Sequence, residues 1–346
     1  MQRNMKQWVE EQKSARRKKA IPILSFPSIQ LLGITVRELI SDSELQARGM
    51  KAVADRTPQA GASVSLMDLS IEAECFGAQI HVSEDEVPTV TRAVIDADAE
   101  EEERMEQARA LEVPPVGTGR TGIYLEAIRR AAEWITDRPV FAGVIGPFSL
   151  AGRLLDVSEA MVYCYEEPEM VHVVLEKAAG FLVSYIRAYR EAGANGVVIA
   201  EPLAGLLSPS LAQEFSGDYC RRIVEAVQDD SFLVIYHNCG NTAIQTLDSI
   251  LSCGAMGYHF GNAISMPELL ERMPGDILTL GNIDPAGILR NGTPETTREA
   301  VEQLLADCGG YANFVPSSGC DIPPMSRWEN IDAFFEAVND YYAERG

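Results

Sequence analysis

Three residues with metal-binding side chains stand out in the second half of the chain. His237 and Cys239 occupy alternate positions of a His-Asn-Cys-Gly segment that directly follows the apolar run Phe232–Tyr236. Side chains at positions i and i+2 of an extended strand point the same way, so this imidazole and this thiol converge. Cys320, in a Ser-Ser-Gly-Cys-Asp segment after a later apolar run, can supply a third ligand. Imidazole and thiolate are typical zinc ligands, and three of them leave one tetrahedral position for a substrate.

The elements that must position these ligands are apolar runs that alternate with helical stretches. Several runs are continuous, as is typical of parallel strands buried on both faces. Alternation on this scale predicts an α/β fold, and 346 residues exceed the roughly 250 that a (β/α)₈ TIM barrel needs. The eight runs are Ile21–Phe26, Ala62–Leu69, Val140–Ile145, Gly196–Ala200, Phe232–Tyr236, Met256–Phe260, Ile277–Leu280 and Tyr311–Pro316.

Helix-start signals lie between the runs. Ser41 and Glu44 have the spacing of a capping box. Ser208 and Thr293 each precede a proline, which places a capping hydroxyl before proline at the first helical position. The stretch Ser158–Ala192 is long enough for two helices, or for one helix with a lead-in.

The predicted domain organisation is one barrel with an N-terminal helical extension. Residues 1–20 are expected to hold the leading helix, and residues 21–346 the catalytic barrel. An insert around residues 82–121 interrupts the alternation. It carries the acidic run Asp96–Glu103 and a Pro-Pro turn, and it is expected to flank or cover the barrel.

Further reactive side chains follow the other predicted strands. The active site of such a barrel lies at the C-terminal ends of its strands. Glu201 and Glu74 are the candidate catalytic carboxylates, with an ion pair to a nearby Arg at the barrel rim as the alternative. His259 is a candidate substrate contact, with metal ligation or acid–base work as its other roles. The remaining candidate substrate-binding residues are Asp68, Asn282 and Asn241.

Charge and composition exclude several classes of function. The formal net charge is −22, from 29 basic and 51 acidic residues. Such an excess repels phosphate backbones and anionic membranes, so nucleic acid is excluded as a partner. No run approaches the roughly 20 apolar residues of a membrane span. Seven cysteines without disulfide-like spacing, and an N-terminus without a signal-like stretch, predict a reduced, cytoplasmic protein. The oligomeric state, including a homo-oligomer, stays open.

Several segments carry a family resemblance. From about Pro139 to its end, the sequence resembles the uroporphyrinogen decarboxylase superfamily in its zinc methyltransferase branch. That branch includes methylcobalamin:coenzyme M methyltransferases and the methyltransferase components of bacterial O-demethylases. The matching segments are Gly143-Val-Ile-Gly-Pro-Phe148, His237-Asn-Cys-Gly-Asn241, Gly281-Asn-Ile-Asp-Pro285, Gly319-Cys-Asp-Ile-Pro-Pro324 with Glu329-Asn330, and, more loosely, Glu72-Ala-Glu74 with Gly77.

The resemblance implies an enzyme that moves a methyl group at zinc, with a corrinoid (cobalamin) carried by a partner protein that docks at the barrel mouth. All three positions of the branch's zinc ligands are filled, by His237, Cys239 and Cys320. The favoured reaction is demethylation of a small substrate, an aromatic methyl ether, onto the partner's cobalt. Its basis is Ser-Ser-Gly-Cys-Asp-Ile-Pro-Pro around Cys320, since coenzyme M enzymes have Pro-Gly-Cys-Gly there. The alternative is a methylcorrinoid:thiol methyltransferase.

The sequence disfavours two other functions. The superfamily's decarboxylases carry an Arg-rich first strand that grips porphyrinogen carboxylates, whereas the segment Ser25–Gln30 contains no Arg. They also have His where Cys320 stands. A barrel that only binds metal or corrinoid would have no need for an open zinc position beside Glu74 and Glu201.

Overall fold

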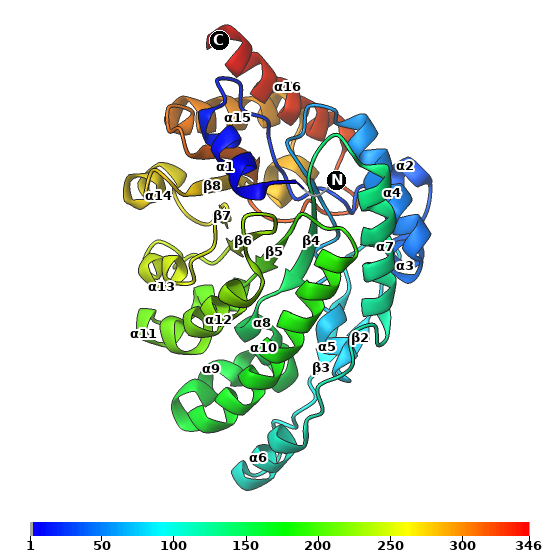
Figure 1. Cartoon of the computed structure of the whole chain (residues 1–346), viewed down its shortest axis with the longest axis vertical. Coiled ribbons are helices and arrows are strands. Elements are labelled where there is room, and N and C mark those ends of the chain that lie inside the picture. Colours follow the sequence, from blue (N-terminus) through cyan, green and yellow to red (C-terminus); the bar gives the residue numbers. More distant parts are fainter. Residues whose placement is uncertain (1–2, 346) are drawn as a thin grey trace.

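Seven parallel strands form the main sheet of the computed structural model, which describes residues 3–345. Their order is β1-β4-β5-β6-β7-β8-β9, so every neighbour follows in chain order and helices make the crossovers (Figure 1). The α/β barrel class predicted from the sequence is confirmed. The strands are β1 Ser63–Val64, β4 Val140–Ile145, β5 Gly196–Ala200, β6 Leu233–Asn238, β7 Gly257–Phe260, β8 Leu278–Ile283 and β9 Phe314–Ser318.

Alternate residues of these strands fill the inside of the curled sheet. Phe141 of β4, Val198 of β5, Ile235 of β6, Leu280 of β8 and Val315 of β9 belong to one buried cluster. Helix α1 (Met5–Ser14) adds Met5, Trp8 and Val9 to the same cluster, and its Met5 N–H donates to Asp230 O just before β6. The leading helix therefore closes the barrel at the N-terminal ends of the strands.

The predicted first strand, Ile21–Phe26, is an extended segment without regular strand pairing. Residues 20–25 form no ladder, which leaves seven of the eight predicted strands in the main sheet. The segment still occupies the eighth position, because Ile21 N–H donates to Pro316 O of β9 and Gly61 N–H donates to Ala20 O. Serine hydroxyls of β9 form hydrogen bonds with other backbone groups of the segment: Ser318 Oγ accepts from Ile23 N–H, and Ser317 Oγ donates to Ile21 O. These side-chain contacts replace part of the regular backbone ladder.

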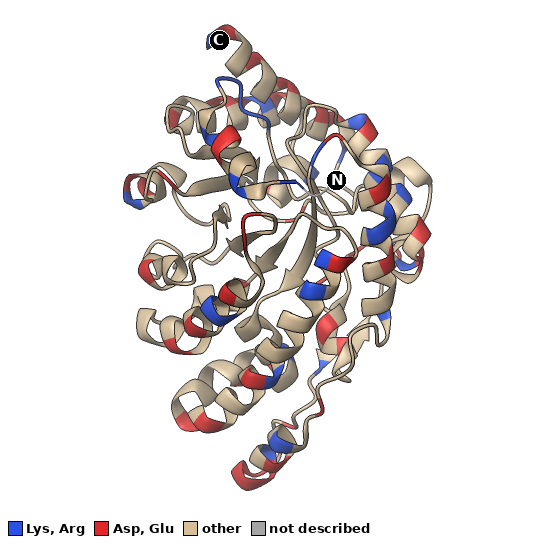
Figure 2. Cartoon of the chain, viewed as in Figure 1, with Lys and Arg blue, Asp and Glu red and all other residues tan. Residues whose placement is uncertain are grey.

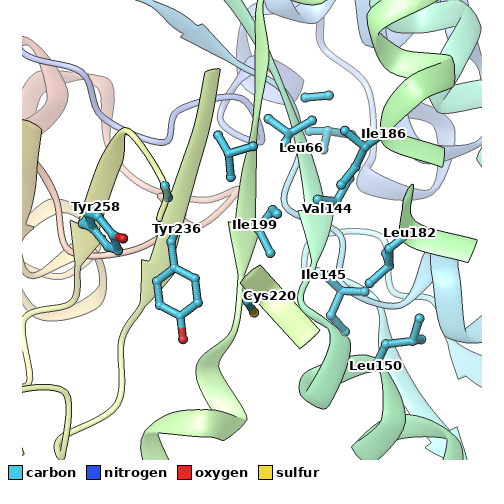
Figure 3. Packing of buried hydrophobic residues seen from close by; sticks show 14 of the residues in the cluster. Leu66, Val144, Ile145, Leu150, Leu182, Ile186, Ile199, Cys220, Tyr236 and Tyr258 are labelled. Atoms are coloured by element: carbon cyan, nitrogen blue, oxygen red, sulfur yellow. The ribbon is translucent and has the colours of Figure 1, made fainter. Parts of the chain in front are cut away.

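A second buried cluster lies between the sheet and the surrounding helices. Figure 3 shows Val144 and Ile199 on the outer face of the sheet, with Leu182 and Ile186 of α10 (Pro168–Glu191) packed near them. The remaining helices are α2 Ser28–Leu32, α3 Val36–Ser41, α4 Ser43–Arg56, α5 Ile71–Cys75, α6 Glu101–Ala110, α7 Arg120–Trp134, α8 Pro147–Leu155, α9 Val157–Glu166, α11 Pro209–Ala212, α12 Asp218–Val227, α13 Leu247–Ser252, α14 Met266–Arg272, α15 Pro294–Cys308 and α16 Trp328–Arg345, with short 3₁₀ or π turns at Pro202–Leu206 (η1), Gln213–Gly217 (η2) and Pro285–Arg290 (η3).

The helix-start signals are confirmed in two of three places. Ser208 caps α11, and Thr293 caps α15 in a reciprocal pair with Thr296. The box predicted from Ser41 and Glu44 is wrong. Asp42, a stronger acceptor one residue later, caps α4 instead. The stretch Ser158–Ala192 was expected to hold two helices or one helix with a lead-in, and the structure has two helices there, α9 and α10.

The region around the predicted insert forms an arm beside the barrel. Its antiparallel hairpin consists of β2 (Gln79–His81) and β3 (Thr89–Arg92), and α6 follows. Arg104 of α6 forms a largely buried ion pair with Glu167, which ties the arm to the junction of α9 and α10. In Figure 1, α6, α8 and α9 gather at the end of the molecule opposite α1. Within residues 3–345, no helix combines the length and apolar character needed to cross a membrane.

Candidate metal centre

The alternation along β6 brings the first two ligands into the barrel. Leu233 and Ile235 belong to the interior cluster, and His237 and Cys239 continue the same every-second-residue series past the end of the strand. The third, Cys320, lies two residues beyond β9. β6 and β9 are not neighbours in the sheet, so its curvature is what brings these residues together.

The three side chains converge as a metal site requires. The ligand atoms of His237, Cys239 and Cys320 all lie within 4.8 Å of one another, and His237 Nε2 is 3.4 Å from Cys320 Sγ. The imidazole is buried and both thiols are half-buried. A hydrogen bond from the Cys320 thiol holds the pKa of Cys239 well below its usual range, and the same contact raises the pKa of Cys320. One imidazole nitrogen, one thiolate and one thiol that a bound metal would deprotonate form a donor set that fits zinc.

His259 lies behind the metal-facing imidazole. It stands opposite His237 in the ladder between β6 and β7, and its Nδ1 is 2.7 Å from His237 Nδ1. Its Nε2 is 2.8 Å from Ser317 Oγ. His259 is 2% exposed, so it is enclosed by the protein and contacts the ligand His237 rather than an open substrate space.

Glycines and amides pack the ligand loops closely together. A Cβ on Gly261 would meet Cys239 Cβ at 2.6 Å, and a Cβ on Gly319 would meet Asn262 N at 2.8 Å. Asn282, predicted to bind substrate, instead donates from Nδ2 to the backbone oxygens of Gly261 and Ile264. Its amide therefore holds the loop on which Cys239 rests.

Glu201 points away from the barrel interior. It follows the outward series of Val197 and Ile199, and its carboxylate accepts the backbone N–H groups of Phe148 and Ser149 at the start of α8. Glu201 is fully buried, and this burial raises its pKa to about 7. A carboxylate at a helix N-terminus satisfies orphan N–H groups and suits the helix dipole.

Asp68 and Glu74 are joined by one arginine. Arg120 of α7 forms ion pairs with Asp68 and with Glu74. Asp68 is buried and also accepts from Tyr124 Oη at 2.8 Å. Glu74 therefore forms the ion pair with a nearby Arg that the sequence offered as the alternative to a catalytic role. Asn241, beyond the ligand loop, is exposed.

Two buried carboxyl groups near these elements keep an oxygen without a partner. Glu72 Oε1 accepts from Ile145 N–H at the end of β4, while Oε2 contacts no donor in the described part of the chain. Burial raises the pKa of Glu72 to about 8. Asp321 accepts from Met67 N–H, and its Oδ1 is likewise unpartnered among residues 3–345. Burial raises its pKa well above the usual range.

Sequence reasoning missed Ser317 and Arg120, whose side chains contact candidate site residues. Ser317 lies two residues after Val315 in β9, so alternation along the strand places its side chain on the same inward face. This pattern could have identified it from the sequence. Arg120 carried no such signal, because its partners Asp68 and Glu74 lie some fifty residues earlier.

Comparisons with known proteins identify the family of the chain. Residues 25–341 match the uroporphyrinogen decarboxylase (URO-D) family. Methylcobamide:CoM methyltransferase MtbA of Methanosarcina acetivorans is 29% identical over 279 residues, covering 79% of this chain and 78% of that protein. A uroporphyrinogen decarboxylase of Coxiella burnetii is 27% identical over 295 residues, covering 81% and 77%.

A solved structure shares the fold. A methyltransferase from Methanosarcina mazei superposes with a TM-score of 0.84 at 23% identity, covering 98% of each chain. The resemblance to corrinoid methyltransferases inferred from the sequence is confirmed in the relatives, which include MtbA proteins of two Methanosarcina species. By the match over residues 25–341, the chain belongs to the uroporphyrinogen decarboxylase family.

Proposed function

We propose that this chain is a corrinoid-dependent methyltransferase whose His237, Cys239 and Cys320 hold a zinc ion. The observation that carries the proposal is the convergence of these three ligand atoms within 4.8 Å at the C-terminal ends of the strands. Bound there, zinc would supply Lewis acidity, which keeps a thiol as thiolate or polarises an ether oxygen. The relatives of similar length that are named methylcobamide:CoM methyltransferases support the same chemistry.

The reaction moves a methyl group between the cobalt of a corrinoid and a sulfur or oxygen atom of a small substrate. In the thiol direction, a thiolate sulfur forms the new bond to carbon, and the cobalt of the methylated corrinoid keeps the electron pair of the broken bond. In the ether direction, reduced cobalt forms the new bond, and the ether oxygen leaves with its electron pair and takes up a proton. The chain's own residues hold the small substrate at the barrel mouth and orient it for an in-line approach.

The corrinoid is proposed to arrive on a separate protein. Three apolar side chains of α9, those of Val157, Val162 and Tyr165, are 37%, 42% and 70% exposed. Leu206, in the turn after β5, is 52% exposed. α8 follows the C-terminal end of β4 and leads into α9, and Leu206 follows the C-terminal end of β5, so both segments leave the sheet at the strand ends that carry the ligands. Exposed apolar patches of this kind mark protein interaction sites.

Acidic residues border the apolar face. A cleft of about 470 Å³ between α6 and the start of α10 is lined by Glu101, Glu106, Glu166 and Glu169, among others. Figure 2 shows acidic residues on α6, at the far end of the arm. A partner with a basic rim around an apolar centre would complement this surface.

Two substrate classes are candidates. The names of the MtbA relatives favour a small thiol as methyl acceptor. The Ser-Ser-Gly-Cys-Asp-Ile-Pro-Pro segment around Cys320 motivates an aromatic methyl ether as methyl donor, as inferred from the sequence. An aryl oxide leaves far more readily than an alkoxide, so Lewis acidity worth several kcal/mol would suffice.

One assay tests the function and separates the two classes. The zinc-loaded protein is mixed with methylcobalamin and a panel of thiols, or with reduced cobalamin and a panel of aromatic methyl ethers, methanol and methyl thioethers. The visible spectrum of cobalt reports gain or loss of methyl. If the protein demethylates methylcobalamin with thiols and does not methylate reduced cobalamin from ethers, the thiol acceptor is supported. If only the ethers react, the ether donor is supported. Absence of both reactions, with zinc bound, would contradict the proposed function.

A further inference from the structure

We infer that His259 and Ser317 are positioning residues that keep a proton off the metal-facing nitrogen of His237. The inference rests on the proposed function, because it concerns how one zinc ligand is held. It is carried by a chain of hydrogen bonds that runs from the backbone of the extended segment at Ile21 to the ligand imidazole.

The direction of every hydrogen bond in the chain follows from its first link. Ser317 Oγ lies 2.7 Å from Ile21 O, a carbonyl oxygen that can only accept. The single hydroxyl proton of Ser317 is therefore committed to Ile21. The contact of 2.8 Å between Ser317 Oγ and His259 Nε2 must then be donated by the histidine, which places a proton on His259 Nε2.

The position of the proton on His259 in turn fixes the donor of its hydrogen bond to His237. A neutral imidazole carries a single proton, so one ring nitrogen donates and the other accepts. With that proton on Nε2, His259 Nδ1 is an acceptor, and the 2.7 Å contact to His237 Nδ1 must be donated by His237. His259 O, 3.3 Å from His237 Nδ1, is a second acceptor for the same proton.

The last link sets the state of the ligand. A neutral His237 with its proton on Nδ1 has a bare lone pair on Nε2, the atom that lies 3.4 Å from Cys320 Sγ. A metal needs that lone pair, because a protonated nitrogen cannot coordinate. The opposite order, with a proton on His259 Nδ1, would leave Nε2 of His237 protonated toward the two cysteines. The chain of bonds thus selects the ligating tautomer before any metal arrives.

Nitrogen-15 NMR tests the proton positions directly. The full chain is labelled with ¹⁵N-histidine, its metal is removed, and long-range ¹H–¹⁵N correlations identify the protonated nitrogen of each ring. The chain has four histidines, so His81→Gln and His172→Gln variants complete the assignment. The expected result is a proton on Nε2 of His259 and on Nδ1 of His237. A proton on Nδ1 of His259 would overturn the inference.

Substitution at Ser317 separates positioning from simple packing. Ser317→Ala should scatter His259 between tautomers and weaken zinc binding by about tenfold or more, in line with the effect of partners that orient metal ligands. Ser317→Thr keeps the hydroxyl and should restore both properties. The matched control is Ser318→Ala, at a buried neighbour whose hydroxyl accepts from Ile23 N–H. It should leave the tautomers and the zinc affinity unchanged.

The outcomes distinguish this inference from the proposed function. If Ser317→Ala keeps the single His259 tautomer and the wild-type zinc affinity, the positioning role is wrong although the metal site stands. If the wild-type chain shows the expected tautomers but binds no zinc, the proposed metal site is wrong although the hydrogen-bond chain stands. If Ser317→Ala fails to fold, the wild-type spectrum still decides the proton positions.

Discussion

His237 Nε2 lies 3.4 Å from Cys320 Sγ, although 83 residues separate the two side chains. β6 and β9, which carry them, are separated in the sheet by β7 and β8. Three strand spacings of a flat sheet would hold them about 14 Å apart. Only a curled sheet brings them within reach of one ion, so the candidate metal centre depends on the curvature of the sheet.

Replacing Gly261 by Ala should weaken metal binding. A Cβ at this position would lie 2.5 Å from Cys239 Cα and 2.6 Å from Cys239 Cβ, so the ligand loop must shift. We expect zinc affinity to fall by about tenfold or more, the scale on which outer contacts tune metal sites. Isothermal titration with zinc measures the change. Gly275→Ala is the control, because an added Cβ there meets no atom within 4 Å. Equal affinities in the two variants would contradict this account of the packing.

The sequence predicted the barrel class from local patterns, and the convergence of His237, Cys239 and Cys320 followed from that class, because the strand ends of a barrel open onto one face. Apolar runs mark buried strands, and alternation fixes which side chains share a face. The same parity argument, applied to Glu201, would have placed it on the outer face with Val197 and Ile199. The partners of Asp68 and Glu74 could not be predicted, since they depend on how α7 packs against α5. The irregular pairing of Ile21–Phe26 likewise depends on the serine hydroxyls of β9, which no local pattern encodes.

Glu72 should make the folded state less stable as the pH rises. Its pKa is about 8 in the fold and about 4.5 in an unfolded chain. Between these values the folded state binds more protons than the unfolded state, so the free energy of unfolding falls with rising pH. The contribution is complete below about pH 4.5 and lost by about pH 8, and Glu201, with a pKa of about 7, acts in the same direction.

Glu72→Gln cannot ionise. The free energy of unfolding of this variant minus that of wild type should therefore be larger at pH 8 than at pH 5. Urea unfolding at the two pH values measures this difference, with Glu225→Gln on the exposed face of α12 as the control. An identical pH dependence in wild type and Glu72→Gln would contradict the burial argument.

Glu201→Ala should destabilise the fold rather than block chemistry alone. Its carboxylate is the acceptor for the N–H groups of Phe148 and Ser149, which would be left buried without an acceptor. Each of the two losses costs roughly 1–3 kcal/mol, so we expect the free energy of unfolding to drop by about 2–6 kcal/mol. Glu201→Gln keeps an acceptor oxygen and should lose less. Chemical denaturation compares the two variants, and a wild-type unfolding curve for Glu201→Ala would show that the capping role is wrong.

The chain should not decarboxylate uroporphyrinogen, despite its family. Residues 25–30 offer no Arg, and the Gln30 amide is already bound to the backbone oxygens of Pro324 and Ser326. Arg37, the first Arg after this segment, pairs with Glu84. The excess of 51 acidic over 29 basic residues would also oppose a polyanion. Anaerobic incubation with uroporphyrinogen, beside a known decarboxylase, should give no coproporphyrinogen; robust formation would refute this prediction.

Zinc content tests the central claim most directly. After dialysis against buffered zinc, elemental analysis should find about one zinc per wild-type chain, held by the donor set of one imidazole and two thiols. Cys239→Ala and Cys320→Ala should each lower the content, and the double variant should abolish it. Cys308→Ala, a buried cysteine of α15, should keep the full amount. A double variant that retains one zinc per chain would contradict the account of this site.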